Sequence, residues 1–398
     1  MENNNDNKVL NVPHLRFPEF SGEWEMVSLQ DIATINPKSD PLQNTFIYID
    51  LEAVEKGELR KIQEIMREEA PSRAQRVIDN NDILFQCVRP YQKNNYIHRI
   101  LNTSNQQWVA STGYAQIRTT ELPNYIYHLL NTDEFNRKVM VRCTGSSYPA
   151  INSEDLATIH LYYTPDKKEQ LKISRLLDLL DKRIATQNKI IEKLQSLIKG
   201  LIDDIITLKC GQLVAFETLY SKAGEGGTPT TSNTEFYDNG SIPFIKIDDL
   251  SNKYLSANKD YITELGLKKS SAWLIPTHSI IYSNGATIGA ISINKYPVCT
   301  KQGILGIVPN TNIDVEFLYY FMQSSYFQKE VERVVTEGTM KTAYLKDINH
   351  IKCPIPDLDR QKEISHLLSV LSLKEDVERQ LLQKYQIQKQ YLLRKMFI

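Results

Sequence analysis

Residues 145–180 read GSSYPAINSEDLATIHLYYTPDKKEQLKISRLLDLL, and residues 338–371 repeat the pattern as GTMKTAYLKDINHIKCPIPDLDRQKEISHLLSVL. Each stretch begins with a glycine loop, contains a Pro-Asp pair, and ends in Gln, Ile and Leu-Leu. The offset is 193 residues at the glycines and 191 at the glutamines, Gln170 and Gln361. A solenoid repeat spans only about 20 to 50 residues. The chain is therefore predicted to contain a duplicated domain, whose pseudo-two-fold symmetry suits two half-sites or two copies of one partner.

A long amphipathic helix is predicted after each domain. In residues 166–207 the spacing alternates between four and three, as in the heptad pattern of a coiled coil. This seam consists of Ile173, Leu177, Leu180, Ile184, Gln187, Ile191, Leu194, Ile198, Leu201 and Ile205. In residues 358–398 the seam is less regular, with charged members Glu375, Glu378 and Lys389 and a partly shifted stripe through Val370, Val377, Leu381, Tyr385 and Leu392. Because packing supplies most helix stability, we expect an antiparallel coiled coil within the chain; a coil that only dimerises the protein is the alternative.

Mixed strand and helix signals predict an α+β domain with a twisted sheet in each half. Short β-rich runs typical of strands lie at 46–49, 83–85, 280–282 and 304–308. Helical periodicity covers 125–141 and 315–335. The predicted organisation is a tail at 1–15, a domain at 16–165, a helix at 166–207, a second domain at 208–357 and a helix at 358–398.

Composition excludes several classes of protein. Hydrophobic residues make up 41% of the chain and charged residues 24%, which is typical of a folded, soluble protein. No stretch reaches the roughly 20 apolar residues of a membrane span, and the Asn-rich start is unlike a signal peptide, so we expect a cytoplasmic protein. The five cysteines form no Cys-x-x-Cys pair, which argues against a zinc site or a disulfide framework.

The net charge of −1 hides two segments without acidic residues. Residues 83–120 and 265–313 contain no Asp or Glu, and each carries four basic side chains. The two segments occupy matching places in the duplication, and a surface that faces phosphates must be free of carboxylates. We therefore expect DNA-facing residues in both segments; the alternative is that they are simply buried sheet.

Candidate DNA-binding residues follow from these segments. Arginine pairs with guanine, and Asn or Gln pairs with adenine, in the major groove. Predicted contacts in the first segment, which also interleaves aromatic residues, are Arg89, Tyr91, Lys93, Tyr96, Arg99, Tyr114 and Gln116. Those in the second segment are Asn284, Thr287, Lys301 and Gln302.

Three loops of small residues are candidates for contacts with the phosphate backbone. Two are the glycine loops that recur after a helix in each half, with the candidates Arg142, Ser146, Ser147, Thr339 and Lys341. The third loop, at 224–233, contributes Thr228 and Thr231. An ordinary flexible loop is the alternative for this third segment, whereas recurrence makes the glycine loops the better candidates.

Sequence signatures of catalysis are absent. The chain has no Walker A loop, no Gly-x-Gly-x-x-Gly fingerprint, and no Asn-Pro-Pro or Asp-Pro-Pro motif followed by an aromatic residue. Its seven histidines are isolated, which favours structural or surface roles. The sequence therefore predicts no catalytic residues, no metal site and no cofactor, and it disfavours a stand-alone enzyme.

Nearly the whole chain resembles the specificity subunits of type I restriction–modification systems. The resemblance rests on the repeated plan of domain and helix and on Trp24, Leu29-Gln-Asp-Ile, Gly226-Gly-Thr-Pro, Ile242-Pro-Phe-Ile and Asp249-Leu. It implies that each domain is a target recognition domain reading one half of a split DNA sequence, with the helices setting the gap. It further implies two S-adenosylmethionine-dependent adenine methyltransferase subunits docked along the helices, and ATP-driven restriction subunits that complete the complex.

Two alternatives remain open from the sequence. One is a specificity module of a methyltransferase–nuclease system outside type I, in which the catalytic partner is a single fused chain. The other is a coiled-coil adaptor that binds proteins and no DNA. The adaptor predicts no salt-dependent DNA affinity, and it leaves both acid-free segments unexplained.

Overall fold

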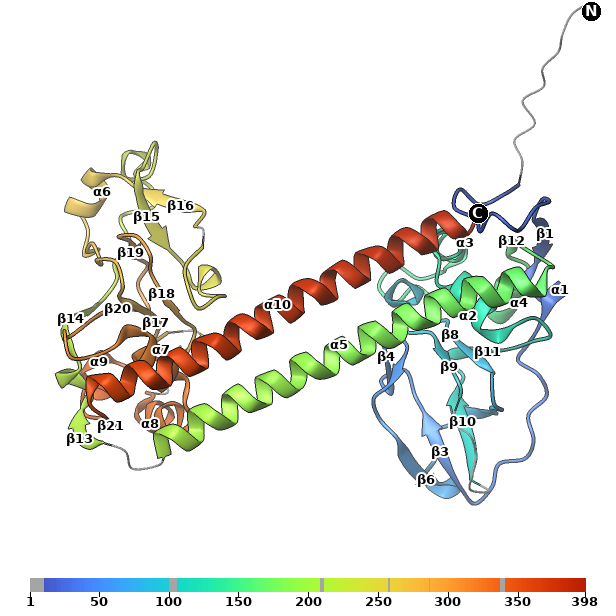
Figure 1. Ribbon diagram of the computed structural model, residues 1–398, viewed down its shortest axis with the longest axis horizontal. Helices are drawn as coiled ribbons and strands as arrows, with labels where there is room; N and C mark the ends of the chain where they lie inside the picture. Colours follow the sequence, from blue (N-terminus) through green and yellow to red (C-terminus); the bar gives the residue numbers. More distant parts are fainter. Residues whose placement is uncertain (1–10, 100–105, 208–210, 257, 286, 337–340) are drawn as a thin grey trace, which may run out of the picture. The chain divides into compact units, whose positions relative to one another are not determined.

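The structure, a computed structural model, describes residues 11–99, 106–207, 211–256, 258–285, 287–336 and 341–398, without the side chains of 205–207. It divides into two compact units (Figure 1). Unit 1 comprises the chain up to Asn188 together with Leu381–Ile398, and unit 2 comprises Lys189–Gln380. Each unit therefore contains one domain and a part of both long helices. Among the described helices, none has the length and apolar character that crossing a membrane requires.

Unit 1 contains two four-stranded sheets. The first has the order β2 (Ala33–Ile35), β11 (Tyr114–Thr119), β8 (Ile83–Gln86) and β9 (Tyr96–Ile97). The second has the order β6 (Gln63–Met66), β3 (Thr45–Ile49), β10 (Gln107–Ser111) and β7 (Ala74–Val77). Two-stranded sheets pair β1 (Glu25–Ser28) with β12 (His160–Tyr163) and β4 (Val54–Glu55) with β5 (Glu58–Leu59). In the second sheet β3 and β10 are parallel, whereas the other pairs are antiparallel.

The helices of unit 1 bury an apolar face against the first sheet. They are α1 (Leu29–Ile32), α2 (Pro123–Leu130), α3 (Asp133–Arg142), α4 (Ser153–Ala157) and α5 (Lys167–Thr207), with 3-10 turns η1 (Arg67–Glu69) and η2 (Pro90–Gln92). Tyr125 and Ile126 of α2 share one core with Phe85 and Ile117 of the sheet. Thr132 caps α3, because its side chain accepts the Phe135 N–H.

Unit 2 repeats this plan. Its four-stranded sheet has the order β14 (Tyr220–Glu225), β20 (Ile304–Pro309), β17 (Ile280–Ser283) and β18 (Ile291–Ile293). A three-stranded sheet has the order β16 (Asp260–Ile262), β15 (Ile242–Ile245) and β19 (Cys299–Thr300), and β13 (Gln212–Ala215) pairs with β21 (Lys352–Ile355). Its helices are α6 (Glu264–Lys268), α7 (Val315–Gln323), α8 (Ser325–Val334), α9 (Leu345–Ile348) and α10 (Leu358–Met396), with η3 (Phe216–Thr218), η4 (Thr234–Phe236) and η5 (Ile247–Asp249). Since β15 and β19 are again parallel, the predicted duplication extends to strand order and direction.

Within unit 1, α5 and the end of α10 run in opposite directions. Lys389 Nζ lies 2.5 Å from Asp181 Oδ1, and Arg183 Nε donates to the Tyr385 hydroxyl at 2.9 Å. As the residue number rises along one helix, it falls along the other. These contacts fit the expected antiparallel pairing.

The shifted stripe predicted for α10 is wrong at two positions. Val370 and Val377 are about half exposed, whereas Glu378 is 8% exposed and therefore buried. The ion pair with Lys374 allows this burial, because a carboxylate is tolerated inside only when it is paired. The buried face of α10 therefore runs from Ile364 and Leu368 to the charged residue Glu378, and it does not shift to the two valines.

One glutamine joins each domain to its long helix. Gln170, at the start of α5, accepts the Leu122 N–H at 3.2 Å and donates to the Thr164 carbonyl at 2.8 Å. Gln361, 191 residues later, accepts the Asp314 N–H at 2.8 Å and donates to the Pro356 carbonyl at 2.9 Å. Both side chains are buried. In each unit the repeated glutamine therefore links the start of a domain helix to the long helix: α2 to α5 in unit 1, and α7 to α10 in unit 2.

Replacing Gln170 by leucine should lower the free energy of unfolding of unit 1 by about 2 to 6 kcal/mol, since two backbone groups lose their partners at about 1 to 3 kcal/mol each. Urea denaturation followed by far-UV circular dichroism measures the loss. Gln195→Leu is the matched control, because Gln195 is exposed on the same helix. Equal urea midpoints for the two variants would show that the hydrogen bonds of Gln170 do not stabilise unit 1.

The end of each long helix forms part of a domain core. Leu393 and Met396 of α10, and Phe397 directly after it, belong to the core of unit 1. Ile202 of α5, with Ile198 and Leu201 packed beside it, belongs to the core of unit 2. Each core therefore draws on residues far away in the sequence.

Polar clusters fasten α2 to α5 and α7 to α10 at matching positions. In unit 1, His128 Nε2 lies 2.8 Å from Asp178 Oδ1. In unit 2, Tyr320 and Ser372 share a 3.0 Å hydrogen bond, and Lys253 contacts both Glu316 of α7 at 2.7 Å and Ser369 of α10 at 2.8 Å. Burial acts to raise the pKa of the Asp178 carboxyl, but interactions with His128, Arg99 and Asn124 together lower it.

Candidate DNA interface

The segment after β8 is tied to the first glycine loop. The Arg89 N–H donates to the Pro149 carbonyl at 2.8 Å, and the Ile151 N–H donates to the Cys87 carbonyl at 3.1 Å. Arg89 and Lys93, on either side of η2, have φ angles of 54° and 52°. Non-glycine residues rarely adopt this left-handed conformation, and such strain is concentrated at functional sites. The backbone of residues 89–93 is therefore held in one unusual shape.

Hydrogen bonds of side-chain amides hold the backbone of residues 89–93 in this conformation. Gln86 Nε2 donates to Gln92 Oε1 at 2.9 Å, and the Asn94 N–H donates to Gln86 Oε1 at 3.0 Å. Asn95 accepts the Gln86 N–H at 2.8 Å and donates to Asn131 at 3.1 Å. The amides that make this segment look suited to reading adenine hold the loop instead.

The tied loops present five side chains, Arg89, Tyr91, Ser146, Ser147 and Tyr148, which we call the unit 1 loop face. The Arg89 guanidinium carbon lies 4.3 Å from the centroid of the Tyr148 ring, a cation–π contact. Tyr91 and Tyr148 are 51% and 64% exposed, and both serines are exposed. Large aromatic groups this exposed favour a surface that binds a partner.

In the folded structure, carboxylates from other parts of the chain lie next to the acid-free segment 83–120. Three of its four basic side chains meet carboxylates from outside the segment, in the pairs Lys93–Asp133 (2.6 Å), Arg99–Asp178 (3.6 Å) and Arg118–Asp82 (2.7 Å). Arg142 instead donates to the Asp155 carbonyl and to Thr158, both at 2.7 Å. The positive surface expected from the sequence is thus reduced in unit 1 mainly to Arg89.

Four predicted DNA-binding side chains are buried, which corrects the sequence interpretation. They are Tyr96, Tyr114, Gln116 and Asn284, each less than 8% exposed. Gln116 donates to the Val77 carbonyl at 2.9 Å and to Asp82 at 2.7 Å, and Asn284 donates to the Ala343 carbonyl at 3.2 Å. Burial raises the pKa of the Tyr114 phenol. These groups stabilise the fold and cannot reach a duplex in this structure.

Unit 2 ties its corresponding loops in the same way. The Asn284 N–H donates to the Gly303 carbonyl at 3.1 Å, and the Ala343 N–H donates to the Asn284 carbonyl at 2.9 Å. Around this junction the predicted contacts Thr287, Lys301, Gln302 and Lys341 are exposed. Thr339 lies outside the described residues. The recurring construction therefore places exposed polar residues after the matching strand, β17.

In the third loop, at 224–233, the two adjacent glycines do not offer their N–H groups to a phosphate. The Gly226 and Gly227 N–H groups already donate to the Ile304 and Thr300 carbonyls, at 2.9 and 3.0 Å. A Cβ atom at Gly226 would lie 2.1 Å from the Thr300 carbonyl oxygen, so this glycine is needed for close packing. Thr231 is exposed, whereas Thr228 is only partly exposed and its hydroxyl oxygen is buried.

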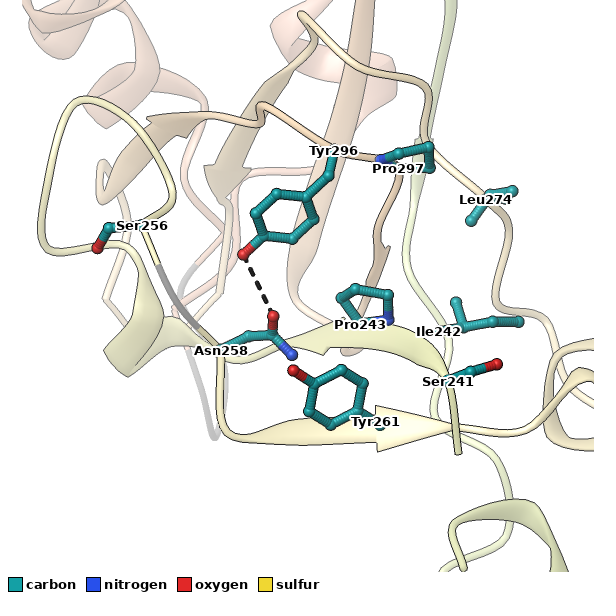
Figure 2. Close-up of a pocket in the computed structure, with 9 residues that line it drawn as sticks. All are labelled: Ser241, Ile242, Pro243, Ser256, Asn258, Tyr261, Leu274, Tyr296 and Pro297. Atoms are coloured by element: carbon teal, nitrogen blue, oxygen red, sulfur yellow. Dashed lines mark hydrogen bonds between the residues drawn. The ribbon is translucent and has the colours of Figure 1, made fainter. Parts of the chain in front are cut away.

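An open cavity of about 700 Å³ in unit 2 was missed by the sequence interpretation. Figure 2 shows Asn258 between Tyr296 and Tyr261, with the Tyr296 hydroxyl 3.2 Å from Asn258 Oδ1. Pro243 and Leu274 line its apolar side. The sequence signal was the mixture of tyrosines and prolines around β15 and β16, which carries no spacing pattern.

Comparison with known proteins relates this architecture to specificity subunits. The chain is 22% identical over 399 residues to the type I restriction enzyme HindI specificity subunit of Haemophilus influenzae, covering 80% of this chain and 83% of that protein. It is 23% identical over 419 residues to the MjaVIII specificity subunit of Methanocaldococcus jannaschii, covering 94% and 91%. The crystal structure of the type I restriction-modification system S subunit from M. genitalium shares the fold, with a TM-score of 0.60, 15% identity and coverage of 97% and 99%.

The family described as type I restriction modification DNA specificity domain matches the chain twice, at residues 21–196 and 220–385. The two matches fall one in each half of the duplication, and together they cover most of the sequence. The chain belongs to the family of type I restriction modification DNA specificity domains.

Proposed function

We propose that this chain is the DNA-reading specificity subunit of a type I restriction–modification complex, with each unit reading one half of a bipartite site. The observation that carries the proposal is the loop construction repeated in both units. After β8 the chain is hydrogen-bonded to residues 149–151, and after β17 to Ala343, and both junctions carry exposed polar side chains. Two copies of one reading surface match a target with two half-sites. Catalysis is assigned to the partner subunits, and the complex acts in the cytoplasm, where the DNA is.

The proposed DNA-facing set is smaller than the one expected from sequence. In unit 1 it consists of the loop face, and in unit 2 of Thr231, Thr287, Lys301, Gln302 and Lys341, with Thr339 kept as a prediction. Lys93, Arg99 and Arg142 are proposed to position these loops, because their side chains already contact other residues of unit 1. The boundaries 16–165 and 208–357 are proposed for the two target recognition domains, with the helices at 166–207 and 358–398 as spacers that set the gap.

Two modification subunits are proposed to dock on matched apolar patches of the long helices. Leu176 and Leu179 of α5 are 36% and 65% exposed, and Leu367 and Val370 of α10, each 191 residues later, are 47% and 51% exposed. Equivalent surfaces on a duplicated chain fit two copies of one partner. Restriction subunits, acting as ATP-driven translocases, then complete the complex.

Leu179→Glu should reduce the number of bound modification subunits from two to one, because a charge in the centre of an apolar contact weakens that site by roughly 30-fold or more. Native mass spectrometry of the reconstituted complex gives the stoichiometry. Leu197→Glu is the matched control, since Leu197 is 49% exposed on the same helix but Gln388 stands at its counterpart. Retention of two subunits by Leu179→Glu would refute this docking patch.

The proposed function is tested by mapping methylated adenines after co-expression of the chain with a modification subunit from its own operon. The expected result is a split motif, two specified blocks around a fixed unspecified gap. Exchange of residues 16–165 should change only one block. The exchange should include residues 381–398 from the same donor, because the end of α10 packs in the core of unit 1. If the complex forms and binds its methyl donor but methylates no split motif, the protein-adaptor function is favoured instead.

A further inference from the structure

We infer that Arg89 reads a guanine in the half-site of unit 1 and that Tyr148 is its positioning residue. The inference rests on the proposed function and deepens it, because it assigns one base contact to one side chain. The pair belongs to the unit 1 loop face, where the two loops are tied together through the backbone.

The Arg89 guanidinium is available for a ligand. It forms no hydrogen bond or ion pair with any residue that the structure describes, and its contact is with the Tyr148 ring at 4.3 Å. A guanidinium carries five N–H donors in a planar fork, so all of them remain unused. The aromatic contact restricts the rotation of a flexible side chain, which reduces the entropy lost when the fork binds.

The backbone under Arg89 is fixed before any ligand arrives. Its N–H donates to the Pro149 carbonyl at 2.8 Å, and its carbonyl accepts the Gln92 N–H at 3.0 Å. The left-handed φ of 54° at a non-glycine residue persists only when the surroundings determine it. The loop thus holds one partly exposed arginine, stacked on Tyr148, on a preorganised backbone.

Charge distinguishes a base contact from a phosphate contact. Proteins that grip the phosphate backbone use several unpaired cations, since affinity rises with each phosphate neutralised. Here Lys93 is paired with Asp133 at 2.6 Å, and the other members of the loop face are tyrosines and serines. A single planar fork among neutral groups fits a base edge with two neighbouring acceptors, and guanine offers O6 and N7 in the major groove.

The test uses the complete chain with its modification subunit and maps methylated adenines in genomic DNA. Arg89→Gly removes the side chain but keeps the backbone, because glycine tolerates positive φ. One guanine in the block assigned to unit 1 should become tolerant to the other bases, with discrimination falling roughly 5- to 150-fold. Arg89→Gln should shift the preference at that position towards adenine, and the second block should stay unchanged.

Tyr148 and a surface arginine supply the controls. Tyr148→Phe should keep the motif, whereas Tyr148→Ala should relax the same single position more weakly than Arg89→Gly. Arg137→Gln, an exposed arginine on α3 paired with Glu134, should leave methylation unchanged.

Three results would overturn the guanine contact: a unit 1 block without guanine on either strand, an Arg89→Gly motif identical to the wild type, or a uniform loss at all sites with the motif retained. The last result would assign Arg89 to a phosphate. Failure of the wild-type complex to produce any split motif would instead refute the proposed function, so the two failures are distinguishable.

Discussion

Replacing Phe397 by alanine should lower the free energy of unfolding of unit 1 by about 3 to 5 kcal/mol. Phe397 lies one residue from the last position of the chain, yet it is only 5% exposed. Its ring centroid lies 6.0 Å from that of Trp24 and 5.5 Å from that of Tyr125, both buried in the N-terminal domain. The truncation would leave a cavity between these rings, and the rigid interior closes such a cavity only in part.

Urea denaturation followed by tryptophan fluorescence measures this loss, because Trp24 contacts the removed ring. Hydrogen exchange should locate the weakened amides in unit 1 and leave those of unit 2 protected. Tyr391→Ala is the matched control, since Tyr391 is 49% exposed in the last turns of α10, just before Phe397, and it should change stability by less than about 0.5 kcal/mol. Equal effects of the two variants, or a loss of protection spread over both units, would contradict the role of the helix end as a part of the first domain.

Replacing Arg16 by methionine should destabilise unit 1 by about 3 to 5 kcal/mol, the usual loss when one partner of a buried ion pair is removed. Arg16 Nε and Nη2 donate to the two carboxylate oxygens of Glu169 at 2.7 and 2.8 Å, and Glu169 is fully buried. The hydroxyl of Thr164 adds one more hydrogen bond, at 2.7 Å. Without Arg16 the carboxylate would keep only that bond in an interior that disfavours charge.

A double variant separates the lost charge pair from lost packing. Arg16→Met combined with Glu169→Gln should recover a large part of the stability, because the neutral amide no longer buries an unpaired charge. Arg175→Met, at an exposed position of α5, the helix that contains Glu169, is the control for the loss of an arginine. Thermal unfolding of the wild type, Arg16→Met, Glu169→Gln and the double variant gives the coupling, and a double variant no more stable than Arg16→Met alone would show that packing, not charge, dominates. The same ion pair cannot form in unit 2, because the residue that corresponds to Glu169 in the second repeat, 191 positions later, is Arg360.

Much of the fold was predictable because it is encoded in local patterns. The heptad spacing of residues 166–207 predicted α5, and the repeated Gln170 and Gln361 marked where each long helix begins. The α10 stripe was misread because hydrophobicity alone suggested Val370 and Val377, whereas ion pairs allow Glu378 to be buried. Local spacing carries no information about which charge will find a partner.

The candidate interface was predictable only in part. The glycine loop at Ser146 and the segment at Arg89 were both singled out, but the sequence did not predict that they are joined by backbone hydrogen bonds. Gln86 and Asn95 belong to the acid-free segment in which amides were expected to read bases, yet their amides form hydrogen bonds inside the loop. Composition counts donors and acceptors, whereas only their placement shows which remain unused.

The sequence by itself determined the duplication and the two long helices, because spacing along the chain carries both, and its short motifs carried the resemblance to the family. Only the tertiary structure decided which charges survive at the surface. Asp133 and Asp178 lie outside the acid-free segment in sequence but meet Lys93 and Arg99 in space, so Arg89 is left without a carboxylate among the described residues. Ion pairing acts over a few ångströms of space, and the fold sets those distances between residues that the sequence keeps far apart.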